Sequence, residues 1–96
     1  MFLHLGGDIV IKLKDVITIM DLETTTISKI TKEFLKTAEE EGFIVNISDD
    51  IPKSFIITEV DKKSKIYLSP ISSVTLYKRA KYLDTIANVN KSSIVN

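Results

Sequence analysis

Basic side chains are the residues of this sequence whose types and placement could do chemistry. The first 48 residues hold five lysines and eight acids, whereas residues 49–96 hold seven lysines, one arginine and five acids. Within residues 53–81, seven basic residues stand against two acidic ones. Lysine side chains at a surface can bind the phosphates of a nucleic acid as point charges. The excess of basic residues makes the second half of the chain the candidate for a phosphate-binding surface.

The last part of this basic segment is a predicted helix that carries Lys78, Arg79 and Lys81. The two lysines point away from the apolar stripe of that helix, and Arg79 lies at its flank. Two interpretations stay open, an ordinary solvated helix face or a patch that contacts phosphates. Arg79 is the only arginine of the chain, and arginine makes the commonest specific contact to guanine. A rich direct readout of base edges is therefore not expected.

The other reactive residue types do not combine into a catalytic or metal-binding set. His4 is the only histidine and cysteine is absent, so no multi-histidine or thiolate metal site is expected and His4 is interpreted as structural. Carboxylates occur in groups at residues 39–41 and 49–50, but these positions are helix ends or turns, where carboxylates are normally solvated. Phosphate loops, nucleophile elbows and dinucleotide-binding motifs are missing. We expect neither enzymatic activity nor a cofactor.

Composition indicates one small globular domain. The chain has 96 residues, of which 44% are hydrophobic and 27% charged, and its formal net charge is zero. No apolar run exceeds three residues, so we expect no membrane-spanning helix or signal peptide, and a cytoplasmic location. A domain of this size buries a modest core, and with no disulfide or metal to help, oligomerisation is a common way to bury more apolar surface.

The first half of the chain predicts three strands followed by a helix. Strand patterns cover residues 2–5, 9–13 and 16–20, with glycines after the first strand that suit a tight hairpin. The threonines at 24–26 are candidates for the cap of the helix. The apolar stripe of that helix consists of residues spaced at three, four and four positions, namely Ile27, Ile30, Phe34 and Ala38.

The second half repeats this order of elements. Strand patterns cover residues 43–47, 54–60 and 65–68, the last two joined by a polar loop at 61–64. Ser69 and Pro70 are expected to begin a helix as its cap and first residue. The apolar stripe of this helix is Leu76, Ala80, Leu83 and Ala87. The polar segment that follows is expected to be a flexible tail.

These elements predict an α+β fold with the order βββ-α-βββ-α. Short polar turns between the strands favour a mainly antiparallel sheet with the two helices packed against it. We expect a single domain over residues 1–87 and the flexible C-terminal tail over residues 88–96.

Three segments of the sequence resemble one known family. They are residues 2–8 (FLHLGGD), residues 51–58 (IPKSFIIT) and residues 66–80 (IYLSPISSVTLYKRA). Together they resemble the RemA/RemB family of bacterial regulators of the extracellular matrix of biofilms, and the opening segment is most similar to the RemB branch. The resemblance covers residues 1–83.

This resemblance implies a cytoplasmic DNA-binding protein that assembles into rings and acts on promoters of extracellular-matrix genes. In the RemA branch, arginines contact DNA just before an early strand and just before a later one. By position these places correspond to residues 14–15 and 49–53 of this chain. Lys14 and Lys53 keep a positive charge there, while the paired arginines of the second place are missing and Asp49 and Asp50 stand nearby.

Residues and resemblance together predict a homo-oligomeric regulator that binds double-stranded DNA through repeated basic side chains. The predicted contacts are Lys12, Lys14, Lys53, Lys78 and Arg79. The alternative is an oligomeric assembly or adaptor protein that binds a protein partner and not DNA, which the zero net charge and the missing arginines favour. Neither interpretation requires a membrane.

Overall fold

Residues 1–23 and 28–95 are described by a computed structural model, with residues 87–95 described by their backbone alone. These described residues form two helices, six strands and one short 3-10 helix. This order confirms the predicted βββ-α-βββ-α arrangement. The elements are β1 (Phe2–Gly6), β2 (Ile9–Lys12), η1 (Leu13–Asp15), β3 (Val16–Asp21), α1 (Lys29–Glu40), β4 (Ile44–Asn46), β5 (Ser54–Val60), β6 (Lys63–Ser69) and α2 (Ser73–Val95).

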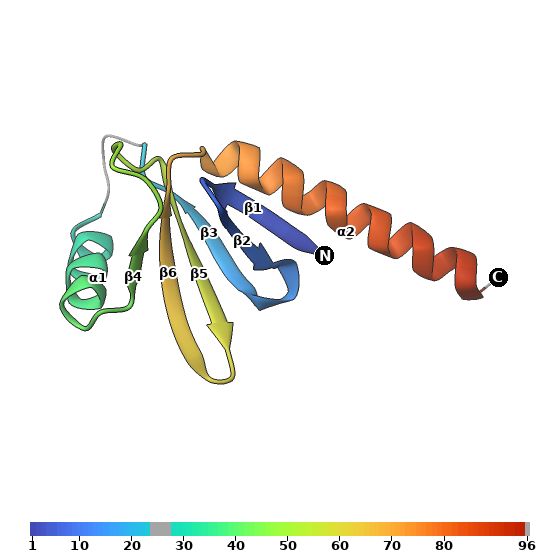
Figure 1. Ribbon diagram of the computed structural model, residues 1–96, viewed down its shortest axis with the longest axis horizontal. Helices are drawn as coiled ribbons and strands as arrows, with labels where there is room; N and C mark the ends of the chain where they lie inside the picture. Colours follow the sequence, from blue (N-terminus) through green and yellow to red (C-terminus); the bar gives the residue numbers. More distant parts are fainter. Residues whose placement is uncertain (24–27, 96) are drawn as a thin grey trace.

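The strands form two sheets. Strands β1 and β2 pair as an antiparallel hairpin, and the other four lie in the order β3-β5-β6-β4. In this four-stranded sheet, as far as the structure describes it, β4 and β6 pair in parallel and the other pairs are antiparallel. In Figure 1 the β1–β2 hairpin and α2 lie to one side of the four-stranded sheet, while α1 lies to the other side, beside β4. The expected α+β class with a mainly antiparallel sheet is therefore correct.

Each face of the four-stranded sheet has its own hydrophobic core. One core joins β1, β2, β3, β5 and α2, and its buried members are Leu3, Leu5, Ile11, Ile19, Ile56 and Leu76. The other joins α1 to the opposite face through Ala38, Phe55 and Ile66. Phe55 and Ile56 are consecutive, and successive side chains of a strand point to opposite faces. Strand β5 therefore contributes to both cores.

The two tight hairpins depend on backbone with positive φ. Gly6 and Gly7 join β1 to β2 with φ of 113° and 54°, as their types predict. Asp61 and Lys62 join β5 to β6 with φ of 51° and 66°, which is the geometry of a two-residue type I′ turn. The predicted four-residue loop at 61–64 is therefore too long, because β6 already begins at Lys63.

Both helices begin later than predicted. The cap of α1 is Ser28, whose Oγ accepts a hydrogen bond from the Thr31 backbone N–H at 3.1 Å; the threonines at 24–26 lie outside the described residues. The Ser72 Oγ accepts from the Thr75 N–H at 3.2 Å at the start of α2. The prediction of Ser69 as the cap is wrong, because its hydroxyl is engaged with Leu5 and Ile71.

The apolar stripe of α1 is only partly buried. Ala38 is buried as predicted, but Ile30 and Phe34 are 79% and 44% exposed, and Ile27 lies outside the described residues. A groove of about 290 Å³ separates these exposed side chains from Met20, Phe55 and Ile57 of the sheet. The helix thus packs on the sheet through its C-terminal half, while its N-terminal half stands away from it.

Helix α2 reaches Val95, beyond the domain boundary predicted at residue 87. Its backbone is helical where the polar pattern suggested a tail without structure. The physical reason is that no glycine or proline follows Pro70, so no residue type interrupts the helix. Figure 1 shows that α2 starts over the β1–β2 hairpin and then projects away from both sheets. Flexibility of residues 88–96 relative to the domain stays a prediction.

Candidate nucleic-acid interface

The five basic residues predicted to contact DNA are all exposed, but they come from separate parts of the fold. Lys12 is the last residue of β2, and Lys14 follows it in η1. Lys53 directly precedes β5, whereas Lys78 and Arg79 lie on α2. Their side chains are therefore available to a partner, and the question is which of them share a surface.

Lys14 and Lys53 lie at opposite ends of the β3–β5 strand pair. Val16 of β3 pairs with Thr58 of β5, and Asp21 pairs with Ser54 at the other end. Thr58 is four positions beyond Ser54 on an extended strand, which corresponds to about 13 Å. One copy of the chain therefore does not bring Lys14 and Lys53 together, and a DNA segment would have to reach them separately or on different copies.

The backbone of Lys53 makes two hydrogen bonds, and acidic residues lie close to it in the sequence or across the strand pair. Its N–H donates to the Ser69 carbonyl at 2.8 Å, and its own carbonyl accepts from the Leu22 N–H at 2.9 Å. Asp21 and Glu23 lie on either side of Leu22, and Asp49 and Asp50 precede Lys53 in the chain. We call these five residues the Lys53 end: Lys53, Asp21, Glu23, Asp49 and Asp50. Four carboxylates therefore accompany one lysine at this end.

Lys12 lies on a larger basic surface that includes the β5–β6 hairpin. Lys12 borders a hollow of about 280 Å³ together with Thr58, Val60 and Tyr67. The same three residues also line an adjoining hollow of about 310 Å³, with Lys63 and Lys65 on its border. We call this combined area the hairpin surface. Its residues are Lys12, Thr58, Val60, Lys63, Lys65 and Tyr67.

The lysines of the β5–β6 hairpin belong to the basic segment found in the sequence, but they were not among the predicted DNA contacts. Lys63, Lys65 and Tyr67 alternate along one strand, and they pair with Val60, Thr58 and Ile56 respectively. Side chains two residues apart on a strand share a face, so the alternation places both lysines on the face that β1 and β2 partly cover. The sequence did not show that β2 ends beside this face of the β5–β6 hairpin, where Lys12 adds a further positive charge.

Arg79 belongs to a different hollow. It borders a space of about 260 Å³ with His4, Tyr82 and Phe2, and Phe2 also borders the hollow beside Lys12. His4 makes a hydrogen bond from Nε2 to the Gly7 carbonyl at 2.8 Å. The histidine therefore closes its own hairpin turn, in agreement with the structural interpretation of this residue.

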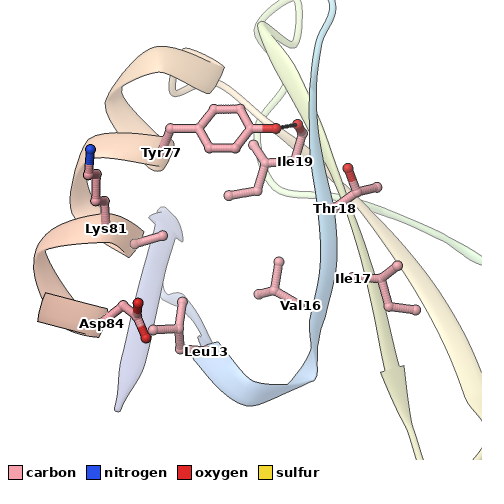
Figure 2. A pocket seen from close by; sticks show the side chains of 9 residues that line it. Leu13, Val16, Ile17, Thr18, Ile19, Tyr77, Lys81 and Asp84 are labelled. Atoms are coloured by element: carbon pink, nitrogen blue, oxygen red, sulfur yellow. Dashed lines mark hydrogen bonds between the residues drawn. The ribbon is translucent and has the colours of Figure 1, made fainter. Parts of the chain in front are cut away.

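Another hollow, of about 460 Å³, lies between α2 and β3. Figure 2 shows that Tyr77 crosses its end and that its hydroxyl donates to the Ile19 carbonyl, at 2.7 Å. Apolar side chains, including Leu13 and Val16, line most of the space, and Lys81 and Asp84 stand at its edge on α2. A lysine and a carboxylate at the edge of an open apolar hollow give no nucleophile paired with a base.

The described residues contain no group of three or more histidine, aspartate or glutamate side chains placed to hold a metal ion. Within the same part of the chain, neither helix has the length and hydropathy needed to cross a membrane.

Comparison with known proteins gives one family. A family model described as extracellular matrix regulatory protein A-like (RemA-like) matches residues 2–80, which include all five predicted basic residues. Extracellular matrix regulatory protein B of Bacillus subtilis (strain 168) is 37% identical over 83 residues, which make up 86% of this chain and 94% of that protein. The chain therefore belongs to the RemA-like family of extracellular matrix regulatory proteins, and within it to the RemB branch.

Proposed function

We propose that this protein is a cytoplasmic, homo-oligomeric DNA-binding regulator of extracellular-matrix genes. The observation that carries the proposal is the family match over residues 2–80, supported by a relative whose name describes regulation of the extracellular matrix. A regulator of this kind acts by binding a partner rather than by catalysis. Exposed lysines and one exposed arginine supply charges for the phosphates of double-stranded DNA.

The proposed contacts are mainly to the DNA backbone. Lysine binds phosphate as a point charge, whereas bidentate recognition of guanine favours arginine. Arg79 is the only arginine of the chain, so each copy can supply few specific base contacts. Repetition of Lys12, Lys14, Lys53, Lys78 and Arg79 in an oligomer would multiply weak contacts into useful avidity on a long DNA segment.

Exposed apolar side chains support the proposed self-association. Nine hydrophobic residues are buried among the described residues, while thirteen large hydrophobic ones are exposed. They include Phe2, Ile17, Ile30 and Ile51, which come from four different parts of the fold. Exposed apolar surface spread over several elements is suited to contacts between copies in a ring.

A titration of fluorescently labelled duplex DNA with the full chain tests this function. Fluorescence anisotropy should rise, and the logarithm of the binding constant should fall linearly with the logarithm of the salt concentration. Sedimentation of the same sample should give an oligomer. An oligomer with no affinity for duplex DNA at low salt would contradict the proposal and favour the adaptor protein, whose partner is another protein.

A further inference from the structure

The two ends of the β3–β5 pair differ in charge and in shape. At the Lys53 end, one lysine stands with four acids close to it in the sequence or across the strand pair. At the other end, Lys12 and Lys14 adjoin the β5–β6 hairpin, which adds Lys62, Lys63 and Lys65. The same molecule therefore has one end that repels a polyanion and one that attracts it.

The acids near the β5–β6 hairpin do not cancel this charge. Glu59 precedes Val60 on β5 and pairs with Ser64. Because successive side chains of a strand point to opposite faces, Glu59 lies on the face opposite to Val60 and Lys63. Asp15 and Asp61 border the hollows of the hairpin surface. Two acids thus accompany the three lysines that border the hollows, and Lys14 and Lys62 lie beside them.

The hairpin surface also has a spacing that suits a DNA strand. Lys63 and Lys65 are two residues apart on β6, which places their Cα atoms about 6.6 Å apart, close to the separation of consecutive phosphates along one strand. Lys12 adds a third charge from β2, across Thr58 and Tyr67. Half-exposed Val60 lines both hollows beside these lysines and offers apolar contact to the sugars.

From this geometry we infer that the hairpin surface is the principal contact of each copy with the DNA backbone. Lys12, Lys63 and Lys65 bind successive phosphates, and Lys53 contributes less because of its acidic neighbours. The inference rests on the proposed function, since it names where duplex DNA binds. It moves the main contact away from the position that the family resemblance implies, where this chain lacks the paired arginines.

Paired alanine substitutions in the full chain test the inference. Lys63→Ala with Lys65→Ala removes two charges from the hairpin surface. The matched control, Lys32→Ala with Lys36→Ala, removes two exposed lysines from α1 on the other side of the sheet. Each phosphate contact contributes about 0.9 to the slope of log binding constant against log salt. The hairpin variant should therefore lose about 2 from this slope for each copy that contacts the DNA, and the control should keep the wild-type slope.

Other outcomes separate the inference from the function on which it rests. Wild-type affinity for duplex DNA with an unchanged slope in the hairpin variant would overturn the inference and leave the function standing, most clearly if Lys53→Ala lowered the slope instead. A wild-type protein that binds no duplex DNA overturns both. Binding to phosphatidylglycerol vesicles but not to DNA would assign the surface to a lipid membrane and overturn the inference. Circular dichroism of each variant confirms that it is folded.

Discussion

A single hydroxyl group joins three parts of this fold. Ser69 is fully buried at the end of β6. Its Oγ donates to the Leu5 carbonyl at 2.6 Å and accepts from the Ile71 N–H at 3.0 Å. The first bond connects β6 to β1, 64 residues away in the sequence, and the second fixes the chain as it turns toward α2. The hydroxyl therefore holds the β1–β2 hairpin in place over the sheet.

Ser69→Ala should destabilise the protein by about 1–3 kcal/mol, because it leaves a buried carbonyl and a part-buried N–H without their partner. Urea unfolding followed by circular dichroism measures this loss. The control is Ser64→Ala on the same strand, where the side chain is exposed, and it should change stability by less than about 0.5 kcal/mol. Equal stability of the two variants would contradict the assigned role of Ser69.

Sequence reasoning predicted some of these single-residue features and missed others. Gly6, at the end of β1, and Gly7, in the turn, have positive φ as predicted, because glycine is the residue type that adopts positive φ most readily. Ser69 was wrongly assigned as a helix cap, because a serine followed by a proline is a common sequence at the start of a helix. The partner that engages its hydroxyl, Leu5, is distant in the sequence, and no local pattern shows it.

At the scale of elements, the two helices are held to the fold to different degrees. Helix α2 buries Leu76 completely in the larger core and anchors Tyr77 to β3 through the Ile19 carbonyl. Helix α1 buries only Ala38 completely, and its N-terminal half leaves Ile30 and Phe34 exposed. We therefore expect α1 to open more readily than α2, since local stability follows buried apolar contact.

Removing the cap of each helix tests this difference. Ser72→Ala should lower the free energy of global unfolding by about 1 kcal/mol, because α2 closes the larger core. Ser28→Ala should instead speed amide hydrogen exchange within α1, with a smaller effect on global unfolding. Hydrogen-exchange mass spectrometry and urea unfolding measure the two effects. If Ser28→Ala lowered global stability as much as Ser72→Ala, α1 would be as firmly held as α2.

The elements themselves were largely predictable, whereas the candidate site was not. Strands β5 and β6 follow from runs of β-branched and alternating residues, and both strands lie within residues 2–80, which the family model matches. The grouping of basic residues depends instead on register and on where β2 ends. The sequence placed Lys14 and Lys53 in one predicted site, and the antiparallel pairing of β3 with β5 puts them at opposite ends.

At the scale of the whole molecule, zero net charge coexists with separated charge and with much exposed apolar surface. The two features serve different proposed contacts. Exposed apolar side chains would be buried in the interfaces between copies of the chain. The lysines would bind DNA on the surface that these interfaces leave exposed to solvent. Salt should affect these contacts differently, because it screens charges and displaces bound phosphates but does not weaken apolar burial.

The proposed assembly should therefore survive salt that abolishes DNA binding. Sedimentation velocity in low and in high salt should give one particle mass that is a multiple of 10.8 kDa. Ile30→Glu with Phe34→Glu, which places charges on the exposed stripe of α1, tests whether this stripe takes part in the assembly and should lower the mass if it does. A 10.8 kDa particle for the wild-type protein under both conditions would contradict self-association.

The measurement that tests the central claim most directly is the salt dependence of duplex DNA binding by the wild-type chain. Anisotropy titrations at several salt concentrations should give a binding constant that falls linearly on logarithmic axes, with a slope of several units from repeated lysine contacts. Flat anisotropy at low salt from a folded protein would contradict DNA binding. In that case the exposed basic and apolar surfaces would serve a protein partner instead.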